Sequence, residues 1–365
     1  MYTPWLLPEF SGLGNKNAVL LEGHPDDLPV LQRMPALIDD LTVRLQSAGS
    51  SEANAEANSL SRQLLALLPD ARSRVVRLID DLKRIAEECG ELADGMDFKF
   101  LLQRNRQLLS VGFDVDTKQL QSACYDLLAS EARTAFFAAI AKDDIRQESW
   151  FLLGRPPIVD QGIAGLLSWT GTMFEYLMPA LWMKTYPNTL LERAEIVAVQ
   201  AQRAYASQKR ISWGISECAY SRKDEAGNYQ YRAFGVPLLA LHKPDQYGPV
   251  VSPYSTFLAL NIDPGAALEN LRKLERMGSV GPYGFYEALD FSPVAGRSGV
   301  RRYESIRCWM AHHQGMSLLS LGNCLREGVV RKWFHSHPRV QATELLLQEK
   351  PADPAPSLRQ RTPAA

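Results

Sequence analysis

Helical periodicity is the feature that most restricts the fold of this 365-residue chain. Beyond residue 116, apolar residues recur at three- and four-residue spacing in segments that Pro, Gly and polar loops separate. Several of these segments are apolar on more than one face, which is typical of helices packed in a ring or a double layer. We therefore predict a mainly α fold, with helices at about 117–142, 165–184, 189–208, 253–261, 264–278, 304–326 and 338–349.

The N-terminal part of the chain has a different pattern. Residues 1–33 are rich in Pro and Gly without a clear period, and they predict an irregular lead-in. Helical patterns over 35–46 and 52–92 predict a helical hairpin, broken near Pro69, with a solvated charged face. Two short apolar runs within Met96–Asp116 predict a β-hairpin. We thus expect an N-terminal part (1–95), a main domain (96–350) and a disordered, Pro- and Ala-rich tail (351–365).

Composition argues against several classes of function. The net charge of −1 gives no basic surplus for nucleic acid or an anionic membrane, so an uncharged partner is expected. Five scattered cysteines without a C-x-x-C pair predict a reducing, cytoplasmic location, no disulfide and no zinc site. No secretory signal is visible at the N-terminus. The segment Gly162–Met183 is long enough to cross a membrane, but Glu175 near its middle and Pro179 favour a buried helix instead.

The stretch Trp213–Pro237 has neither helical nor strand periodicity over its length. It places Glu217 among small residues and carries several aromatic residues between glycines: Trp213, Tyr220, Tyr229, Tyr231 and Phe234. Aromatic faces on flexible backbone suit a sugar ring, and polar neighbours can bind its hydroxyl groups. The alternative is a structured loop whose aromatic side chains fill a core.

Four glutamates occupy apolar or aromatic settings rather than charged faces. Glu131 is predicted to lie on the apolar stripe of a helix, about 20° from Leu120 at 100° per residue. Glu175 lies in an otherwise apolar or hydroxylic helix, and Glu217 and Glu287 lie among small and aromatic residues. Burial raises the pKa of a carboxyl group, while a polar site keeps its partner ionised, which is the combination that glycosidic-bond chemistry needs. The alternative is a set of structural ion pairs, with Arg133 as one candidate partner for Glu131.

Adjacent histidines occur in the late helix, at His312 and His313. Their side chains point about 100° apart, so they form a poor metal site, and hydrogen bonding to a sugar or a carboxylate is the better interpretation. The sequence contains no phosphate-binding loop, serine-hydrolase motif or dinucleotide-binding motif, and we expect neither a metal nor a cofactor.

Six motifs give the chain a resemblance to a known family. YDLLASEAR, SWTGTMFEYLMP, WGISECAY, NYQYRAFGVP, YGFYEALDF and MAHHQGMSL together resemble cyclic β-1,2-glucan synthases, in particular their central glycoamylase-like cyclisation domain. The resemblance extends from about Met96 to Lys350. It implies an (α/α)₆-type barrel that cyclises linear β-1,2-glucan by anomer-retaining transglycosylation. Related glycoamylase-like enzymes instead hydrolyse this glucan.

The resemblance also implies which residues form the site. The expected working pair is Glu131 and Glu217, as nucleophile and acid/base in unassigned order, with Glu287 as first and Glu175 as second reserve. Candidate walls of the sugar subsites are Trp169, Trp213, Tyr220, Tyr229, Tyr231, Tyr283 and Tyr286. Candidate donors to hydroxyls or carboxylates are Arg232, His312, His313 and Gln314.

The sequence departs from the family pattern in two respects. The family's proteins are much longer, with a membrane-embedded glycosyltransferase before this region and a phosphorylase-like region after it. About nine candidate helices are visible where a full ring has twelve, so an incomplete barrel is one expectation. Three alternatives to cyclisation remain open: hydrolysis, a truncated glycan-binding module without turnover, and a helical scaffold whose glutamates are ion-paired.

Overall fold

The computed structural model describes residues 2–10, 13, 30–48, 55–129, 131–160, 163–242, 247–292 and 303–351. The predicted tail beyond residue 351 therefore lies outside the described residues, as does most of the predicted lead-in. The chain divides into two compact units, Met1–Met96 and Asp97–Ala365, which are considered separately below.

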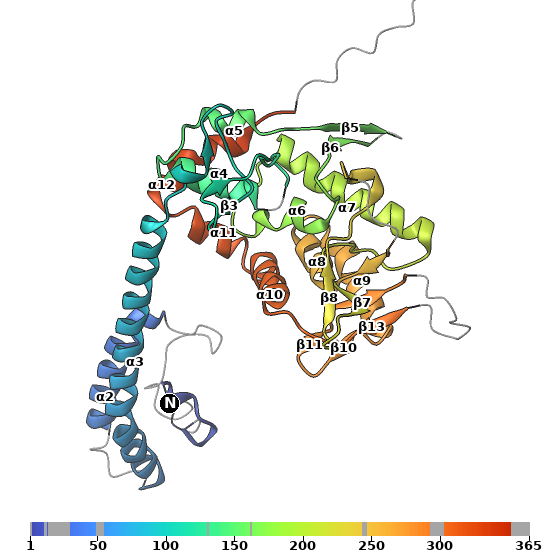
Figure 1. Cartoon of the computed structure of the whole chain (residues 1–365). Helices are drawn as coiled ribbons and strands as arrows, with labels where there is room; N and C mark the ends of the chain where they lie inside the picture. Colours follow the sequence, from blue (N-terminus) through green and yellow to red (C-terminus); the bar gives the residue numbers. More distant parts are fainter. Residues whose placement is uncertain are drawn as a thin grey trace, which may run out of the picture. The chain divides into compact units, whose positions relative to one another are not determined.

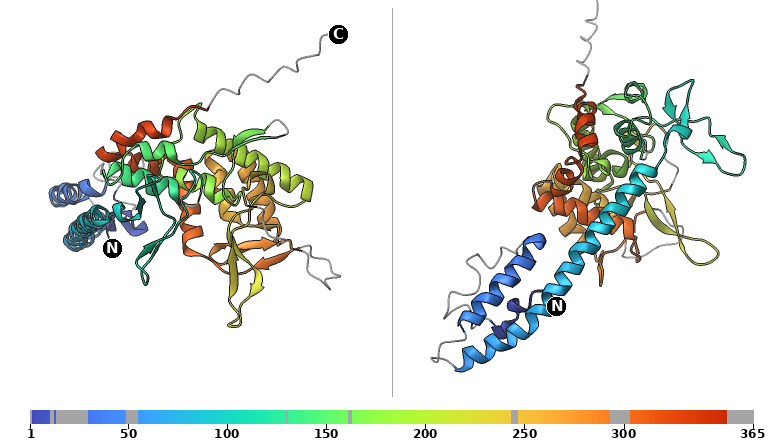
Figure 2. Two further views of the ribbon diagram at one scale, coloured as in Figure 1. Left: turned by 45° about the horizontal axis from the view of Figure 1, so that its top comes forward. Right: turned by 90° about the vertical axis from the view of Figure 1, so that its left-hand side faces the viewer.

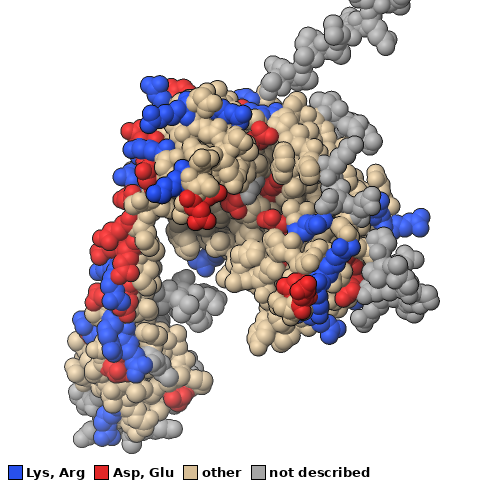
Figure 3. Space-filling view, viewed as in Figure 1, with Lys and Arg blue, Asp and Glu red and all other residues tan. Residues whose placement is uncertain are grey.

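The first unit is a helical hairpin, as predicted (Figure 1). Its helices are α2 (Met34–Ala48) and α3 (Ala55–Gly95), accompanied by the short 3₁₀ turns η1 (Pro4–Leu6), η2 (Pro8–Phe10) and η3 (Leu31–Arg33). The predicted break at Pro69 is wrong, because α3 continues through it. A proline removes one helical hydrogen bond, but Leu68 and Ala71 on either side are buried in the core of the hairpin and hold the helix. Acidic and basic residues are interspersed along the exposed surface of α3 (Figure 3).

The second unit is mainly helical with small antiparallel hairpins, which confirms the predicted fold class. Its helices of ten or more residues, within the described part, are α4 (Ala132–Ala141), α7 (Leu190–Lys209), α9 (Pro264–Arg276) and α10 (Ala311–Leu325). Shorter helical elements connect them: η4 (Lys99–Leu101), α5 (Glu148–Leu152), α6 (Met173–Leu177), η5 (Pro179–Leu181), η6 (Pro237–Leu239), α8 (Pro253–Leu258), η7 (Ala259–Asn261), α11 (Val329–Phe334), α12 (Pro338–Thr343) and η8 (Glu344–Gln348).

The strands of this unit are two to six residues long. Antiparallel pairs are β1–β2 (Leu102–Gln103, Leu108–Leu109), β3–β4 (Phe113–Asp114, Gln119–Leu120), β5–β6 (Pro157–Asp160, Ile163–Leu166), β7–β8 (Cys218–Lys223, Tyr229–Arg232) and β10–β11 (Val280–Gly281, Gly284–Phe285). A three-stranded sheet has the order β13 (Glu304–Ile306), β12 (Ala288–Asp290), β9 (Val250–Val251). In Figure 2 (left) the hairpins around residues 100–120 and the β7–β8 hairpin project from the same side of the helical body.

Three predicted helices differ from the observed elements. The first begins at Ala132 rather than at residue 117, because Phe113–Leu120 forms a hairpin. The Asp114 carboxylate accepts the backbone N–H groups of Asp116 and Thr117, which fixes the hairpin turn. The segment 165–184 contains β6, α6 and η5 instead of one long buried helix, and 304–326 contains β13 before α10. Among the described residues, no helix is both long and apolar enough to span a membrane.

Candidate active site

A cavity of about 470 Å³ lies where the segment after β4, the loop before α6 and the ends of the β7–β8 hairpin meet. Two carboxyl groups of the predicted set, Glu175 and Glu217, line it. Its remaining lining residues are Val111, Ala123, Cys124, Tyr125, Asp126, Ala129, Trp169, Thr170, Thr172, Phe174 and Ala233. The cavity thus combines acidic groups with one large exposed aromatic ring, Trp169, whose side chain is 54% exposed.

Trp169 is held in place at the cavity wall by a second ring. It stacks on His242, with ring centroids 5.5 Å apart and planes inclined by 10°. The backbone supports the same arrangement, because the His242 N–H donates to the Trp169 carbonyl over 2.9 Å. A fixed, exposed indole face beside carboxyl groups is suited to stacking against a sugar ring.

Glu175 is buried, and its carboxylate has several hydrogen-bond donors. Its oxygens accept from the hydroxyls of Ser168 at 2.8 Å, Thr170 at 2.9 Å and Thr172 at 3.0 Å, and from the N–H groups of Thr170 and Thr172. Thr172 and Glu175 form a capping box at the start of α6. The sequence signal for it, T-x-x-E before an apolar run, is present at Thr172, but the prediction of one long helix concealed it. Glu175 therefore holds the loop that carries Trp169, and its oxygens have donors within the protein.

Glu217 occupies a loop that the surrounding structure fixes on both sides. The Tyr254 hydroxyl donates to the Glu217 carbonyl at 3.0 Å and lies 2.8 Å from the Ser216 hydroxyl. Gly214 has a φ of +110°, and a Cβ there would lie 2.7 Å from the Ser255 hydroxyl, so the loop requires glycine at this position. The Glu217 side chain is half-buried. Burial and, after it, the negative charges of Glu131 and Glu175 raise its pKa to about 7.

The prediction that Glu131 points into a helical core is wrong. Glu131 is exposed at the residue preceding α4, and Leu120, on the predicted stripe, belongs to β4. Its charge nevertheless acts on the cavity, because it raises the pKa of Glu217 and of Tyr125. The structure therefore brings Glu131 within electrostatic range of Glu217, although not for the reason that the sequence suggested.

Arg133, the ion-pair partner considered for Glu131, instead binds deeper in the fold. Its guanidinium lies 3.6 Å from the Glu195 carboxylate and donates to the carbonyls of Glu175 at 3.1 Å and Tyr176 at 2.7 Å. Both Arg133 and Glu195 are buried. The described side-chain partners of Glu175 and Glu287 are likewise not arginines, so the scaffold alternative receives no support from these two residues.

Glu287 is buried behind β7 rather than at the cavity surface. One carboxylate oxygen accepts the Ala219 N–H at 3.1 Å, and the other lies 2.9 Å from Nδ1 of His313. Nε2 of His313 lies 3.3 Å from the Tyr231 hydroxyl. His313 is also buried, with its ring stacked on Tyr254 at a centroid distance of 3.8 Å. Glu287 and His313 thus form one hydrogen-bonded chain that ends at Tyr231.

The other predicted wall residues fall into different environments. Trp213 and Tyr220 are buried in the hydrophobic core, as the core-filling alternative expected. Tyr229 is half-buried under the Lys223 ammonium, 4.9 Å from its ring centroid. Tyr283 is 76% exposed and packs with Tyr286 around Trp309, and neither tyrosine is among the residues that line the cavity.

The remaining predicted hydrogen-bond donors, His312 and Gln314, also lie in different environments. His312 is exposed next to His313, with ring centroids 4.0 Å apart. Partial burial of His312 lowers its pKa most, and the electrostatic effect of the neighbouring His313 lowers it further. The Gln314 side chain donates a hydrogen bond to the Phe285 carbonyl at 3.0 Å, which connects α10 to β11. No group of three or more His, Cys, Asp or Glu side chains within the described ranges could hold a metal ion.

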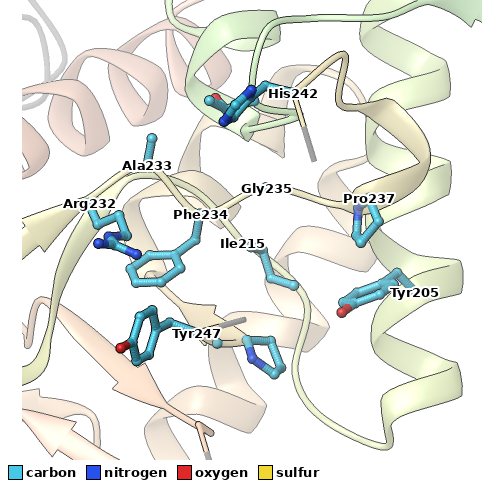
Figure 4. Close-up of a pocket in the computed structure, with 12 residues that line it drawn as sticks. Tyr205, Ile215, Arg232, Ala233, Phe234, Gly235, Pro237, His242 and Tyr247 are labelled. Atoms are coloured by element: carbon cyan, nitrogen blue, oxygen red, sulfur yellow. The ribbon is translucent and has the colours of Figure 1, made fainter. Parts of the chain in front are cut away.

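Arg232 lines a second cavity, of about 310 Å³, on the other side of the Arg232–Gly235 segment (Figure 4). Its guanidinium lies 5.1 Å from the centroid of the Tyr247 ring. Figure 4 shows Arg232, Phe234 and Tyr247 together on one side of this cavity and Tyr205 of α7 on the other. Thr170, Ala233 and His242 connect the two cavities, because the first two line both and the third stacks on Trp169.

Sequence reasoning missed three residues of the site. Asp126 lines the cavity, and burial raises its pKa. Tyr125 lies beside it and Tyr254 supports the Glu217 loop. Tyr125 and Asp126 stand in a motif that the resemblance used, but the predicted helix over 117–142 concealed their position. Nothing in the local sequence of Tyr254 points to Glu217, which is 37 residues away.

Comparison with known proteins finds a matching family model, a relative and similar solved structures. The model of the Glycoamylase family, described as "Putative glucoamylase", matches residues 124–338. A cyclic β-(1,2)-glucan synthase of Rhizobium meliloti is 40% identical over 329 residues, which cover 89% of this chain and 12% of that protein. Structures of an endo-β-1,2-glucanase from Talaromyces funiculosus with β-1,2-glucan and with sophorose have TM-scores of 0.47, identities of 11% and 13%, and coverage of 87% of this chain and 63% of theirs.

Proposed function

Because the chain belongs to the Glycoamylase family, as its motifs predicted, we propose that it is a carbohydrate-active domain that acts on linear β-1,2-glucan in the larger cavity. The substrate class follows from the glucan synthase with 40% identity over 89% of this chain. This chain spans only 12% of that protein, so the activity proposed for this chain rests on the residues of its own site. The observation that carries the proposal is that Glu217 and the exposed ring of Trp169 line one cavity. Burial and then the charge of Glu131 raise the pKa of Glu217 there.

The proposed catalytic pair is Glu131 and Glu217. A carboxyl group with a pKa of about 7 next to a second carboxylate allows the pair to hold one proton near neutral pH. One group can then protonate the leaving oxygen while the other attacks the anomeric carbon. Glu175 and Glu287 are not assigned to this chemistry, because hydroxyl, N–H and imidazole groups of the protein bind their oxygens.

The proposed reaction is an anomer-retaining transglycosylation. The carboxylate attacks the anomeric carbon, the bond from that carbon to the O2 atom of the next glucose breaks, and the acid gives its proton to that oxygen. The 2-hydroxyl at the far end of the same chain then attacks the glycosyl-enzyme ester. Its proton returns to the acid/base group, and the carboxylate leaves. If water attacks instead, the product is a shortened linear glucan, which is the hydrolytic alternative.

Incubation of the chain with linear β-1,2-glucan tests this function. We expect cyclic products, which mass spectrometry distinguishes because each is lighter by one water than the linear chain of the same length. Linear β-1,3-glucan serves as the control substrate and should remain unchanged. Shorter linear products would select hydrolysis, and retention on glucan without products would select a binding module. The absence of both products and binding would contradict the proposal and would favour the scaffold.

The electrostatic coupling of the pair can be measured without substrate. In protein labelled with ¹³C at glutamate carboxyl groups, the Glu217 signal should titrate with a midpoint of about 7. Glu131→Gln should lower this midpoint, because it removes a negative charge that disfavours ionisation of Glu217. Glu225→Gln, at an exposed position between β7 and β8, should leave it unchanged. An unshifted midpoint in Glu131→Gln would mean that the two carboxyls are not neighbours.

A further inference from the structure

A buried hydrogen-bonded chain ends on the β7–β8 hairpin. Glu287 precedes β12, His313 lies in the first turn of α10, and Tyr231 lies on β8. Glu287 and His313 are each about 2% exposed, whereas Tyr231 is 43% exposed. The three side chains therefore extend from the protein interior to a partly exposed tyrosine.

The direction of each hydrogen bond follows from the chemistry of the groups. One oxygen of Glu287 accepts the Ala219 N–H, and the other lies 2.9 Å from Nδ1 of His313. A carboxylate only accepts, so Nδ1 carries a proton, and in the tautomer with no second ring proton Nε2 is an acceptor. In that tautomer the Tyr231 hydroxyl, 3.3 Å from Nε2, is the donor. A buried carboxylate that selects one imidazole tautomer in this way is a known arrangement in hydrolytic enzymes.

The register of the β7–β8 hairpin places Tyr231 near Glu217. In the β7–β8 register, Tyr231 is opposite Ala219, which follows Glu217 by two residues. Burial and then the charge of Glu217, with a further contribution from Glu131, raise the pKa of the Tyr231 phenol. Tyr231 therefore stays protonated near neutral pH, within electrostatic range of both carboxyls of the proposed pair.

We propose that Tyr231 is a substrate-binding residue that accepts a hydrogen bond from a sugar hydroxyl beside Glu217, and that Glu287 and His313 are positioning residues that fix the direction of its O–H. This inference rests on the proposed function. It assigns Glu287 a role through His313 rather than on the sugar itself. The class of ligand is a neutral carbohydrate that presents a hydroxyl donor, because the phenolic proton is already used by the protein.

The tautomer of His313 tests the inference without substrate. Long-range ¹H–¹⁵N correlation spectra should show Nδ1 protonated and Nε2 unprotonated in the unmodified chain, and also in Tyr231→Phe. In Glu287→Gln the amide can donate to Nδ1, so the proton should move to Nε2 and the Tyr231 O–H should turn outward. His312→Asn identifies the neighbouring ring signals. A doubly protonated ring, or a proton on Nε2 in the unmodified chain, would overturn the inference.

Glucan affinity gives the second readout. By calorimetry with linear β-1,2-glucan, Tyr231→Phe and Glu287→Gln should each weaken binding by about three- to tenfold, the range for one lost hydrogen bond. The double variant should bind no more weakly than Tyr231→Phe, because Glu287 acts only through the phenol. Additive losses would assign Glu287 a general structural role and reject the inference while the proposed function stands. An unmodified chain that does not bind glucan would reject both, whatever the tautomer.

Discussion

Replacing Glu217 by glutamine is expected to reduce turnover of linear β-1,2-glucan by about a thousandfold or more. The amide keeps the size of the side chain, but it can neither attack an anomeric carbon nor donate a proton to a leaving oxygen. Glu217 is half-buried, and the loop around it is held by backbone and hydroxyl contacts of its neighbours, so the fold should be unaffected. The measurement is the initial rate of product formation at saturating glucan, with circular dichroism as the check on folding.

The matched control for this variant is Glu225→Gln, which makes the same chemical change at an exposed position of the β7–β8 hairpin and should keep full activity. Glu131→Gln should lose activity to a similar extent if the two glutamates form the working pair. Turnover within about tenfold of the unmodified chain in Glu217→Gln would remove this residue from the chemistry.

Azide can then assign the two roles. With the glycine variant of the nucleophile, azide replaces the missing carboxylate and yields a glycosyl azide of inverted configuration. With the glycine variant of the acid/base, the glycosyl-enzyme forms slowly, because water must give the proton to the leaving oxygen, and azide then yields the retained configuration. The anomer obtained with Glu131→Gly and with Glu217→Gly therefore identifies each group, which the sequence leaves open.

The sequence predicted the mainly helical class and singled out Glu217 as a candidate, because both inferences depend on local patterns. Repeated three- and four-residue spacing identifies α7, α9 and α10 directly. The segment around Glu217 was recognisable because one acid among small and aromatic residues is unusual in a core. The same reasoning failed for Glu131, since the turn chemistry of Asp114 creates a hairpin where a helical stripe was counted.

The contacts that define the site could not be predicted from spacing. Glu287 and His313 are 26 residues apart, and Tyr231 is 82 residues from His313. Trp213 and Trp169 both occur in motifs that were predicted to bind sugar. Trp213 is nevertheless buried in the core, whereas Trp169 is exposed at the cavity. Local composition cannot distinguish these cases, because burial of an aromatic side chain depends on which distant segment packs over it.

Arg133 has a structural role beneath the cavity that the sequence did not indicate. It connects α4 to α7 through Glu195, and to the backbone of α6 through the carbonyls of Glu175 and Tyr176. Burial raises the pKa of Glu195 to about 7, even though Arg133 acts to lower it. A pKa raised above its ordinary value means that the folded state binds the proton more tightly, so this contribution to stability is complete at low pH and is lost as pH rises through about 7.

Arg133→Met is therefore expected to lower the free energy of unfolding by about 3–5 kcal/mol above neutral pH, because a buried carboxylate loses its counter-charge and two buried carbonyls lose their donor. The loss should be smaller at about pH 5, where a protonated Glu195 no longer needs that charge. Urea unfolding at about pH 5 and about pH 8.5 measures both values. The double variant with Glu195→Gln should recover much of the loss at the higher pH, since no charge then remains buried. Equal losses at the two pH values, or a loss below about 1 kcal/mol at the higher one, would show that the Arg133–Glu195 pair does not carry the stability assigned to it.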